Sequence, residues 1–224
     1  MPNQPDKEHQ HDHDHDHGHD HADDHSHDPG PFQPDEEVHS YYQFLGLAIR
    51  DLMIEKGHFT AEDVRKAIEY RDSVTPAIGA RVVAKAWVDP DYKARLLVDA
   101  NAAVKELGID MGATTLYAVE NTPKVHNVIV CTLCSCYPRN LLGLPPSWYK
   151  SFEYRSRVVR EPRQVLREFG TPLPESVEVR VHDSTADIRY LVLPMRPEDA
   201  GGLSESQLAE RVTRDCMVGV AVLT

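Results

Sequence analysis

The chain has 224 residues, enough for one large domain or for one domain with an extension. Its net charge of −12 argues against nucleic acid or an anionic membrane surface as the main partner. No apolar run approaches the ~20 residues that a membrane span requires, and the first residues include no apolar signal core. We therefore expect a cytoplasmic protein with no membrane or nucleic-acid partner.

A low-complexity segment occupies residues 1–36, in which nine His alternate mainly with Asp. Nine acidic side chains and one Lys fall within residues 1–30, which gives this stretch a charge of −8 out of the total of −12. Almost nothing in it can be buried, so we predict a disordered tail. Imidazole and carboxylate groups bind borderline metals. The tail is interpreted either as a metal storage or delivery segment or as a solubilising one.

Residues 37–112 contain mainly helical signals, and we interpret them as a helical arm. Apolar residues recur at helical spacing before Gly57. Thr60, with Asp63 three positions later, resembles an N-cap with an acidic first turn. Asp89-Pro90 is typical of a helix start, because Pro tolerates the first helical position. Helices are therefore expected over residues 45–53, 60–70 and 80–87, and from 89 onward.

The pattern changes to strands with interspersed helices over residues 113–224, which we interpret as a metal-binding α/β domain. Ser204 with Gln207 makes a capping box, and Pro145-Pro146 opens a short helix. The fold class predicted for the whole chain is α+β, with an N-terminal helical arm followed by a layered domain of a sheet with flanking helices. Strands are expected over 116–119, 125–130, 177–181, 188–192 and 217–223, and helical turns over 154–160 and 162–169.

Three of the four cysteines of the chain lie within the six residues Cys131-Thr132-Leu133-Cys134-Ser135-Cys136. Thiolates this close together can face one point, which favours a soft transition metal. Because Cys134 and Cys136 are two residues apart, the main-chain nitrogens of Ser135 and Cys136 are credible additional ligands. The pattern predicts a metal site formed by Cys131, Cys134, Ser135 and Cys136, with one coordination position left open.

The spacing alone leaves two other interpretations of the cysteines open. A structural zinc site normally closes with four side chains, so it would need a distant ligand such as Cys216. A Cys-x-x-Cys redox pair would leave the third thiol without a role. Core packing does not explain three cysteines in six residues.

From Val128 onward the sequence closely resembles the α-subunit of nitrile hydratase. Weaker similarity extends the resemblance over most of residues 40–222, through Ala84-Lys85-Ala86-Trp87 and Glu120-Asn121-Thr122. The motifs that mark it most clearly are Val130-Cys131-Thr132-Leu133-Cys134-Ser135-Cys136, Gly143-Leu144-Pro145-Pro146-Ser147-Trp148-Tyr149-Lys150, Tyr154-Arg155-Ser156-Arg157-Val158-Val159-Arg160-Glu161-Pro162-Arg163 and Val212-Thr213-Arg214-Asp215.

This resemblance implies a low-spin Co(III) ion bound by the sulfurs of Cys131, Cys134 and Cys136 and by the amide nitrogens of Ser135 and Cys136. Iron is the less favoured metal, because Thr132 matches the cobalt-type pattern. The resemblance also implies that Cys134 becomes a sulfinate and Cys136 a sulfenate, both steps on the ordinary oxidation ladder of cysteine. These two cysteines are the predicted catalytic residues, with the Cys136 sulfenate or an activated water as the nucleophile.

The resemblance implies partners as well. They are a homologous β-subunit, present as one chain or split into two, a metallochaperone or activator that loads the metal, and a small nitrile substrate. The metal would lie at the interface with the β-subunit, so the chain alone is expected to be inactive. Asp187 and Arg189 match an acidic-x-Arg pair near that interface and are predicted to surround the metal ligands. The other interpretation of this pair is an exposed charge pair on a strand.

Two departures from the family pattern affect the predicted substrate. Gly112-Ala113-Thr114 stands where many members have Gln-Gly-Glu, and Arg139 stands where Trp is common. The metal-bearing γ-subunit of thiocyanate hydrolase, a close relative, also has Cys-Tyr-Pro-Arg and a His/Asp-rich start, and an Arg near the metal favours an anion. Against that, Gly143-Leu144-Pro145-Pro146 and Trp148-Tyr149-Lys150 look more like nitrile hydratase, so the resemblance implies a nitrile hydratase that forms amides. Thiocyanate hydrolysis to carbonyl sulfide and ammonia is the first alternative, and a non-catalytic metal-binding module is the second.

Overall fold

The computed structural model describes residues 41–223, so the predicted disordered tail at 1–36 lies outside the described residues. The elements are α1 (Tyr41–Glu55), α2 (Ala61–Ser73), α3 (Pro76–Val88), α4 (Pro90–Val98), α5 (Ala100–Glu106), β1 (Thr115–Glu120), β2 (Val125–Val130), α6 (Arg139–Leu142), α7 (Ser147–Lys150), α8 (Phe152–Arg157), α9 (Pro162–Glu168), β3 (Glu178–Asp183), β4 (Ile188–Leu193), η1 (Glu198–Ala200), α10 (Glu205–Arg211) and α11 (Arg214–Val218).

The described strands form two parallel pairs. β1 pairs with β4, and β2 pairs with β3 in a register that sets Val130 opposite Asp183. An antiparallel bridge between Thr122 and Val125 reverses the chain between β1 and β2. Because of this reversal, the beginnings of β1 and β4 lie at the same edge as the ends of β2 and β3. The loop that follows β2 leaves from this edge.

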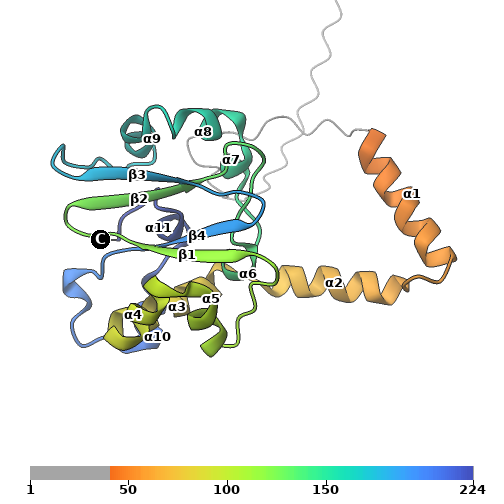
Figure 1. Cartoon of the computed structure of the whole chain (residues 1–224), viewed down its shortest axis with the longest axis horizontal. Helices are drawn as coiled ribbons and strands as arrows, with labels where there is room; N and C mark the ends of the chain where they lie inside the picture. The colour runs from red at the N-terminus through yellow and green to blue at the C-terminus, as the bar shows by residue number, and fades with distance from the viewer. Residues whose placement is uncertain (1–40, 224) are drawn as a thin grey trace, which may run out of the picture.

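Helices cover the strand pairs on two sides (Figure 1). Helices α7 to α9 lie on one side, and α3 to α5 with α10 lie on the other. Val128, Ile129 and Val130 of β2 are fully buried between these layers, together with Tyr149 and Tyr154. This arrangement of helices packed on strands confirms the predicted α+β class.

Several helices begin at the caps that the sequence predicted. Thr60 and Asp63 form a capping box at α2, and Ser204 and Gln207 form another at α10. The side chain of Asp89 accepts a hydrogen bond from the main chain at the start of α4. These bonds satisfy main-chain N–H groups that the first turn of a helix leaves without partners.

The predicted strand over residues 217–223 is wrong. Residues up to Val218 belong to α11, which Thr213 caps through a hydrogen bond from the Cys216 N–H. Gly219 then ends the helix in the left-handed conformation, at φ +90°. Met217, Val218 and Val220 are buried by packing rather than by strand pairing, whereas Val222 is exposed. The main-chain N–H of Val220 donates to the carbonyl oxygen of Asp215. Burial of a short apolar run is compatible with either structure.

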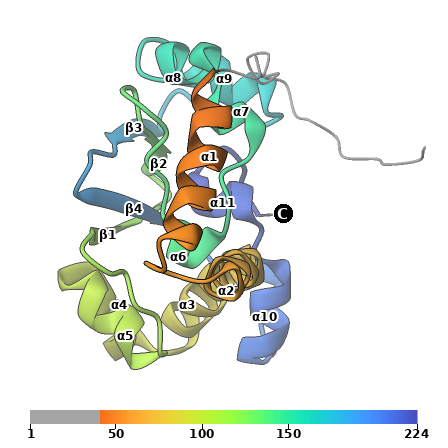
Figure 2. The same cartoon turned by 90° about the vertical axis from the view of Figure 1, so that its right-hand side faces the viewer.

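Helices α1 and α2 project from the body of the molecule (Figures 1 and 2). No residue of α1 is buried, and its exposed side chains include Tyr41, Tyr42, Phe44, Leu47 and Ile49. Within the predicted arm, only these two helices extend outward, because α3 to α5 pack against the strands or against one another. A boundary near residue 112 stays a prediction.

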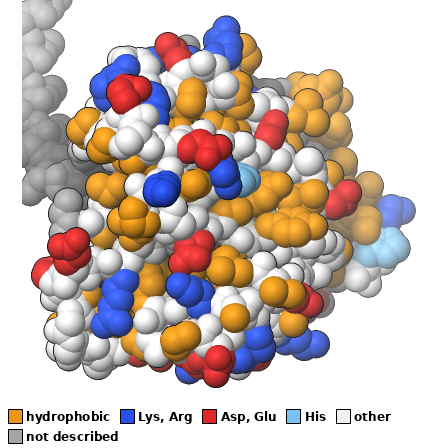
Figure 3. Space-filling model, turned by 60° about the vertical axis from the view of Figure 1, so that its left-hand side comes forward, with side chains coloured by type: hydrophobic (Ala, Val, Ile, Leu, Met, Phe, Trp, Pro, Cys, Tyr) orange, Lys and Arg blue, Asp and Glu red, His pale blue; other side chains and the backbone are white. Residues whose placement is uncertain are grey.

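On the face shown in Figure 3, basic and acidic side chains are interspersed with hydrophobic ones. This face therefore presents no extended surface of a single charge sign. Within residues 41–223, none of the helices combines the length and the apolar character that crossing a bilayer would need.

Candidate metal centre

The cysteine loop begins directly after β2, where buried packing fixes its first residue. Cys131 follows Val130 and is fully buried, whereas Cys136 is half-buried and Cys134 is exposed. The loop thus rises from the core toward the surface. Its first thiol is held by the sheet, and the other two lie where a small molecule can reach them.

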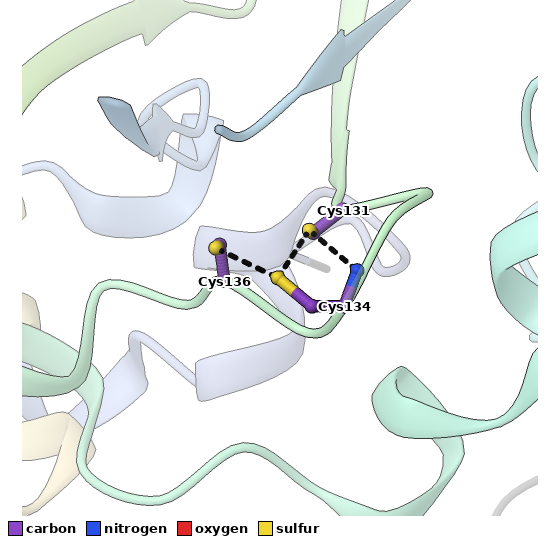
Figure 4. Close-up of side chains that lie close together, drawn as sticks. All are labelled: Cys131, Cys134 and Cys136. Atoms are coloured by element: carbon purple, nitrogen blue, oxygen red, sulfur yellow. Dashed lines mark hydrogen bonds between the residues drawn. The ribbon is translucent and has the colours of Figure 1, made fainter. Parts of the chain in front are cut away.

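The three thiols converge as the sequence predicted (Figure 4). Their sulfur atoms all lie within 4.8 Å of one another. The Sγ atom of Cys134 is 3.4 Å from that of Cys131 and 3.2 Å from that of Cys136. The main-chain N–H of Cys134 donates to the Cys131 sulfur at 3.3 Å, and the N–H of Cys136 is also directed at this sulfur. The backbone therefore folds around the same point as the side chains.

The surroundings shift the pKa values of two of these thiols in opposite directions. Burial acts to raise the pKa of Cys131, but hydrogen bonds from several main-chain N–H groups and from the Cys134 thiol together outweigh it, and the pKa falls below its ordinary value. Burial raises the pKa of Cys136, and its hydrogen bonds with the neighbouring thiols raise it further. A metal that binds Cys136 must therefore displace a proton, so metal uptake is favoured at higher pH.

Two polar contacts that sequence reasoning missed hold the loop. Both carboxylate oxygens of Asp183 accept hydrogen bonds from Thr132, one from its main-chain N–H at 2.9 Å and one from its hydroxyl at 2.6 Å. The buried hydroxyl of Tyr149 donates to the carbonyl oxygen of Cys136 at 2.9 Å. The first contact follows from the pairing of β2 with β3, because Asp183 lies opposite Val130.

A cavity of about 480 Å³ opens beside the loop. Cys134, Ser135 and Cys136 contribute to its lining. So do Arg189, which was predicted to surround the metal ligands, and Arg139, which was predicted to lie near the metal. The positive charge of Arg189 favours the thiolate of Cys136. Its guanidinium also donates to main-chain carbonyl groups, including that of Tyr137 at 3.2 Å, which ties β4 to the residue after the last cysteine.

Asp187, which was also predicted to surround the metal ligands, does not line this cavity. It is exposed, and its main-chain carbonyl accepts from Thr115 at 2.7 Å. The predicted pair is thus separated. Arg189 donates to the carbonyl oxygen of Tyr137 at the loop. Asp187 lies on the turn before β4, so the rule that residues two apart in a strand share a face does not apply to this pair.

Other potential ligands lie apart from the cluster. Cys216 is buried, and its sulfur accepts from the Thr213 hydroxyl at 3.1 Å, so it does not supply the fourth thiol of a zinc site. His126 is buried with Nε2 2.7 Å from the carbonyl oxygen of Gly219, and burial lowers its pKa. His182 lies beside Asn127. Both histidines therefore have partners away from the cysteine cluster.

The donor set fits a soft transition metal. Three thiolate sulfurs together with main-chain nitrogen form a soft, strongly electron-releasing environment, and both donor types are present at one point in this loop. The Cys131, Cys134 and Cys136 side chains and the main-chain nitrogens of Ser135 and Cys136 are the groups that could hold such an ion.

The fold and this loop define a class of α+β proteins with a cysteine-rich metal centre at the end of a buried strand. The family model described as nitrile hydratase, alpha chain, matches residues 40–221. The chain therefore belongs to the nitrile hydratase α-chain family.

Relatives within this family have more than one activity and more than one metal. The chain is 49% identical over 189 residues to the cobalt-containing nitrile hydratase subunit alpha of Pseudonocardia thermophila, covering 83% of this chain and 93% of the relative. It is 48% identical over 199 residues to the thiocyanate hydrolase subunit gamma of Thiobacillus thioparus, covering 84% and 82%. A mutant of the Fe-type nitrile hydratase from Comamonas testosteroni superposes with a TM-score of 0.77 at 43% identity, covering 83% of this chain and 92% of that one.

Proposed function

We propose that this chain is the metal-bearing subunit of a nitrile hydratase that converts nitriles to amides at a Co(III) centre. The observation that supports this most directly is the convergence of three thiols within 4.8 Å beside a cavity large enough for a small substrate. Similarity to a cobalt-containing nitrile hydratase subunit over 83% of the chain supports the choice of both reaction and metal.

The proposal assigns roles to the cysteines of the loop and to the residues that hold it. Cys131, Cys134 and Cys136, with the main-chain nitrogens of Ser135 and Cys136, hold the ion. When bound, a trivalent ion supplies Lewis acidity toward the nitrogen end of a carbon–nitrogen triple bond. The oxidised Cys136 side chain would orient a water whose oxygen adds to the carbon while its protons pass to the nitrogen, giving the amide. If the Cys136 oxygen attacked the carbon itself, a water would then have to release it. Asp183 and Tyr149 keep the loop in place through Thr132 and the Cys136 carbonyl.

A β-subunit partner is part of the proposal, because the relatives are named as subunits of larger enzymes. The exposed apolar side chains of α1 support it from this chain. Phe44 is 66% exposed and Leu47 is 49% exposed, on a helix without a single buried residue. A projecting apolar helix of this kind is typical of a surface that another chain covers.

Thiocyanate hydrolysis is the second candidate, and one observation favours it. Arg139 lines the cavity, and a guanidinium there would stabilise an anionic substrate. The similarity to the thiocyanate hydrolase γ-subunit is as extensive as that to the nitrile hydratase subunit.

The test is to express the chain with its partner subunit and to assay the purified complex with acetonitrile and with thiocyanate. Amide formation without carbonyl sulfide, with one tightly held cobalt ion per complex protomer, is the expected result. Carbonyl sulfide without amide would replace the proposal with the second candidate. Several ions that a chelator removes easily, with no turnover of either compound, would indicate a storage module.

Intact mass analysis of the cysteine loop tests the metal centre separately from turnover. We expect two added oxygen atoms at Cys134 and one at Cys136 in the loaded complex. Unmodified thiols around a divalent ion would contradict the proposed centre.

A further inference from the structure

Three buried polar side chains form a network at the end of the strands away from the cysteine loop. Asn121 directly follows β1, and His126 and Asn127 belong to β2. Their side chains are buried, with His126 only 4% exposed, and buried polar groups need hydrogen-bond partners. The end of the described chain lies beside the same turn between β1 and β2 (Figure 1). The proposed reaction uses none of these three residues.

Contacts with the main chain fix the direction of each hydrogen bond around His126. The side-chain oxygen of Asn121 accepts from the main-chain N–H of Asn127 at 2.7 Å, so the Asn121 amide nitrogen is the atom that lies 3.3 Å from Nδ1 of His126. On the other side of the ring, Nε2 lies 2.7 Å from the carbonyl oxygen of Gly219, which can only accept. His126 therefore carries its proton on Nε2 and accepts at Nδ1.

The hydrogen bonds of Asn127 prevent the amide of Asn121 from turning over. The side-chain nitrogen of Asn127 donates to the Glu120 carbonyl oxygen at 2.8 Å and to the Asn121 side-chain oxygen at 2.9 Å. If a proton from solvent bound to Nδ1 of His126, the new N–H would face the Asn121 amide nitrogen, which also donates. Rotating the Asn121 amide would break both bonds that it accepts from Asn127. The network thus accommodates only neutral His126.

The surroundings of His126 do not compensate a positive charge. Its ring lines a cavity of about 210 Å³, and no other side chain among the described residues that line this cavity is ionisable. Burial lowers the pKa of His126 by more than the bond with the Gly219 carbonyl raises it. The charged side chains of neighbouring elements pair with one another instead, Lys93 with Glu120, Glu178 with Arg180 and Arg214 with Asp215.

A second histidine contacts the network from β3. Nε2 of His182 lies 2.8 Å from the side-chain oxygen of Asn127. Because the Asn127 amide nitrogen is used by Glu120 and Asn121, this oxygen must accept, and His182 donates from Nε2. A further proton on His182 would leave this hydrogen bond intact, whereas a further proton on His126 would not leave its bond with Asn121 intact.

We propose that protonation of His126 is a pH-sensitive switch that opens the turn between β1 and β2, at the start of the strand that carries the cysteine loop. While the imidazole is neutral, Asn121 connects it to Asn127 and the turn stays closed. Because the pKa of His126 in the folded chain lies below the ordinary value of 6.5, the open form binds the proton more readily. The closed turn is therefore fully stable above this pH and loses stability as the pH falls below it.

Hydrogen–deuterium exchange of residues 121–128 in the assembled, metal-loaded complex tests the switch. The protection factor removes the intrinsic pH dependence of exchange and reports the local opening of this segment. Between about pH 7.5 and about pH 5.5 we expect the protection factor to fall about tenfold, since His126 of the open form is mostly protonated one unit below its ordinary pKa. Helix α10 contains no histidine and should change by less than about twofold.

The most informative variant reverses the hydrogen-bonding role of one group. Asn121→Asp has nearly the same shape but presents an oxygen to Nδ1 of His126, so protection should rise as the pH falls, because the carboxylate favours the protonated ring. His126→Gln cannot gain a proton, and its protection factor should stay within about twofold over this pH range. His58→Gln removes an exposed histidine after α1 and is the matched control, which should behave as the unmodified complex.

Three results would overturn the proposal. They are an unchanged protection factor in the unmodified complex, an equal fall in Asn121→Asp, and a fall that persists in His126→Gln but disappears in His182→Gln. The last result would make His182 the titrating group. If His126→Gln does not assemble, the comparison of Asn121→Asp with the unmodified complex decides. None of these measurements depends on turnover of a nitrile or of thiocyanate.

Discussion

At the scale of single residues, Cys131 differs from the other two cysteines of the loop because it belongs to the core. It is fully buried, and main-chain N–H groups converge on its sulfur. Cys134 and Cys136 sit on the exposed side of the loop and face the cavity. The buried thiol therefore anchors the centre, and the two outer thiols are available for oxidation and for contact with a substrate.

We expect Cys131→Ala to abolish metal uptake, because it removes the one sulfur that the sheet holds in place. Elemental analysis of the purified complex measures this directly. Cys216→Ala is the matched control, since it removes another buried cysteine outside the cluster. Full cobalt content in the Cys131 variant would contradict the assignment of this ligand.

Asp183 was not predictable from the sequence, because fifty-one residues separate it from Thr132. Only the parallel pairing of β2 with β3 brings its carboxylate to the loop. Tyr149 was missed for another reason, because its contact with Cys136 depends on how α7 packs against the loop. In contrast, the cysteines are adjacent in sequence, so their convergence could be predicted from spacing alone.

Asp183→Ala is expected to lower the metal affinity of the loop by about 10- to 100-fold, the range typical of residues that orient metal ligands. Retention of cobalt during a timed exposure to a chelator measures the effect. Asp187→Ala removes an exposed carboxylate from the neighbouring turn without touching the cavity and should behave as the unmodified protein. Equal loss in both variants would show that the Thr132 contacts are not what stabilises the loop.

At the scale of elements, local signals predicted the starts of α2, α4 and α10 correctly, whereas the structure of the C-terminal segment was predicted wrongly. Capping boxes at Thr60 and Ser204 depend on residues three positions apart, so the sequence displays them fully. Residues from 89 onward were predicted to be helical, but the break at Asp99, which ends α4 and caps α5, was not predicted. The strand expected at 217–223 failed because Gly219 and the packing of α11, rather than β propensity, decide that segment.

Gly143→Ala is expected to destabilise the protein, because it combines a conformation at φ +70° and ψ −149° with a collision at Val74. Such a backbone conformation costs a residue other than glycine about 1–3 kcal/mol. Each kcal/mol lowers the melting temperature of a chain of this size by roughly 2–4 °C. Thermal unfolding measures the change. Gly46→Ala, in an open position on α1, is the control and should not lower the melting temperature.

At the scale of the whole molecule, the body and the projecting helices have different requirements for stability. Buried side chains from α3 to α11 and the strands form the core, whereas α1 contributes no buried residue. The sequence predicted an arm from helical periodicity, but the same periodicity could not distinguish a helix packed on the body from a helix that projects. Which helices leave the body is decided by contacts distant in sequence, such as the one between Val74 and Gly143.

We expect Phe44→Ser with Leu47→Ser to weaken assembly with the partner subunit while changing the melting temperature of the separate chain little. The two residues share one face of α1, three positions apart, and both are exposed in the structure. Truncating two buried anchors of an interface typically costs more than about 2 kcal/mol, or roughly a 30-fold change in Kd. Analytical ultracentrifugation gives this value, and Glu55→Ala on the same helix is the control.

The two hydrogen bonds from Thr132 to Asp183 bear on whether residue 132 determines which metal the cysteine loop binds. Serine at this position would donate the same two bonds, and only a methyl group would disappear. The contact with Asp183 therefore does not distinguish threonine, which matches the cobalt-type pattern, from serine. If exchanging threonine for serine changes which element is incorporated, discrimination depends on the space that one methyl group fills during maturation. If the exchange does not change the incorporated metal, the metal is selected by cellular supply before the metal centre is complete.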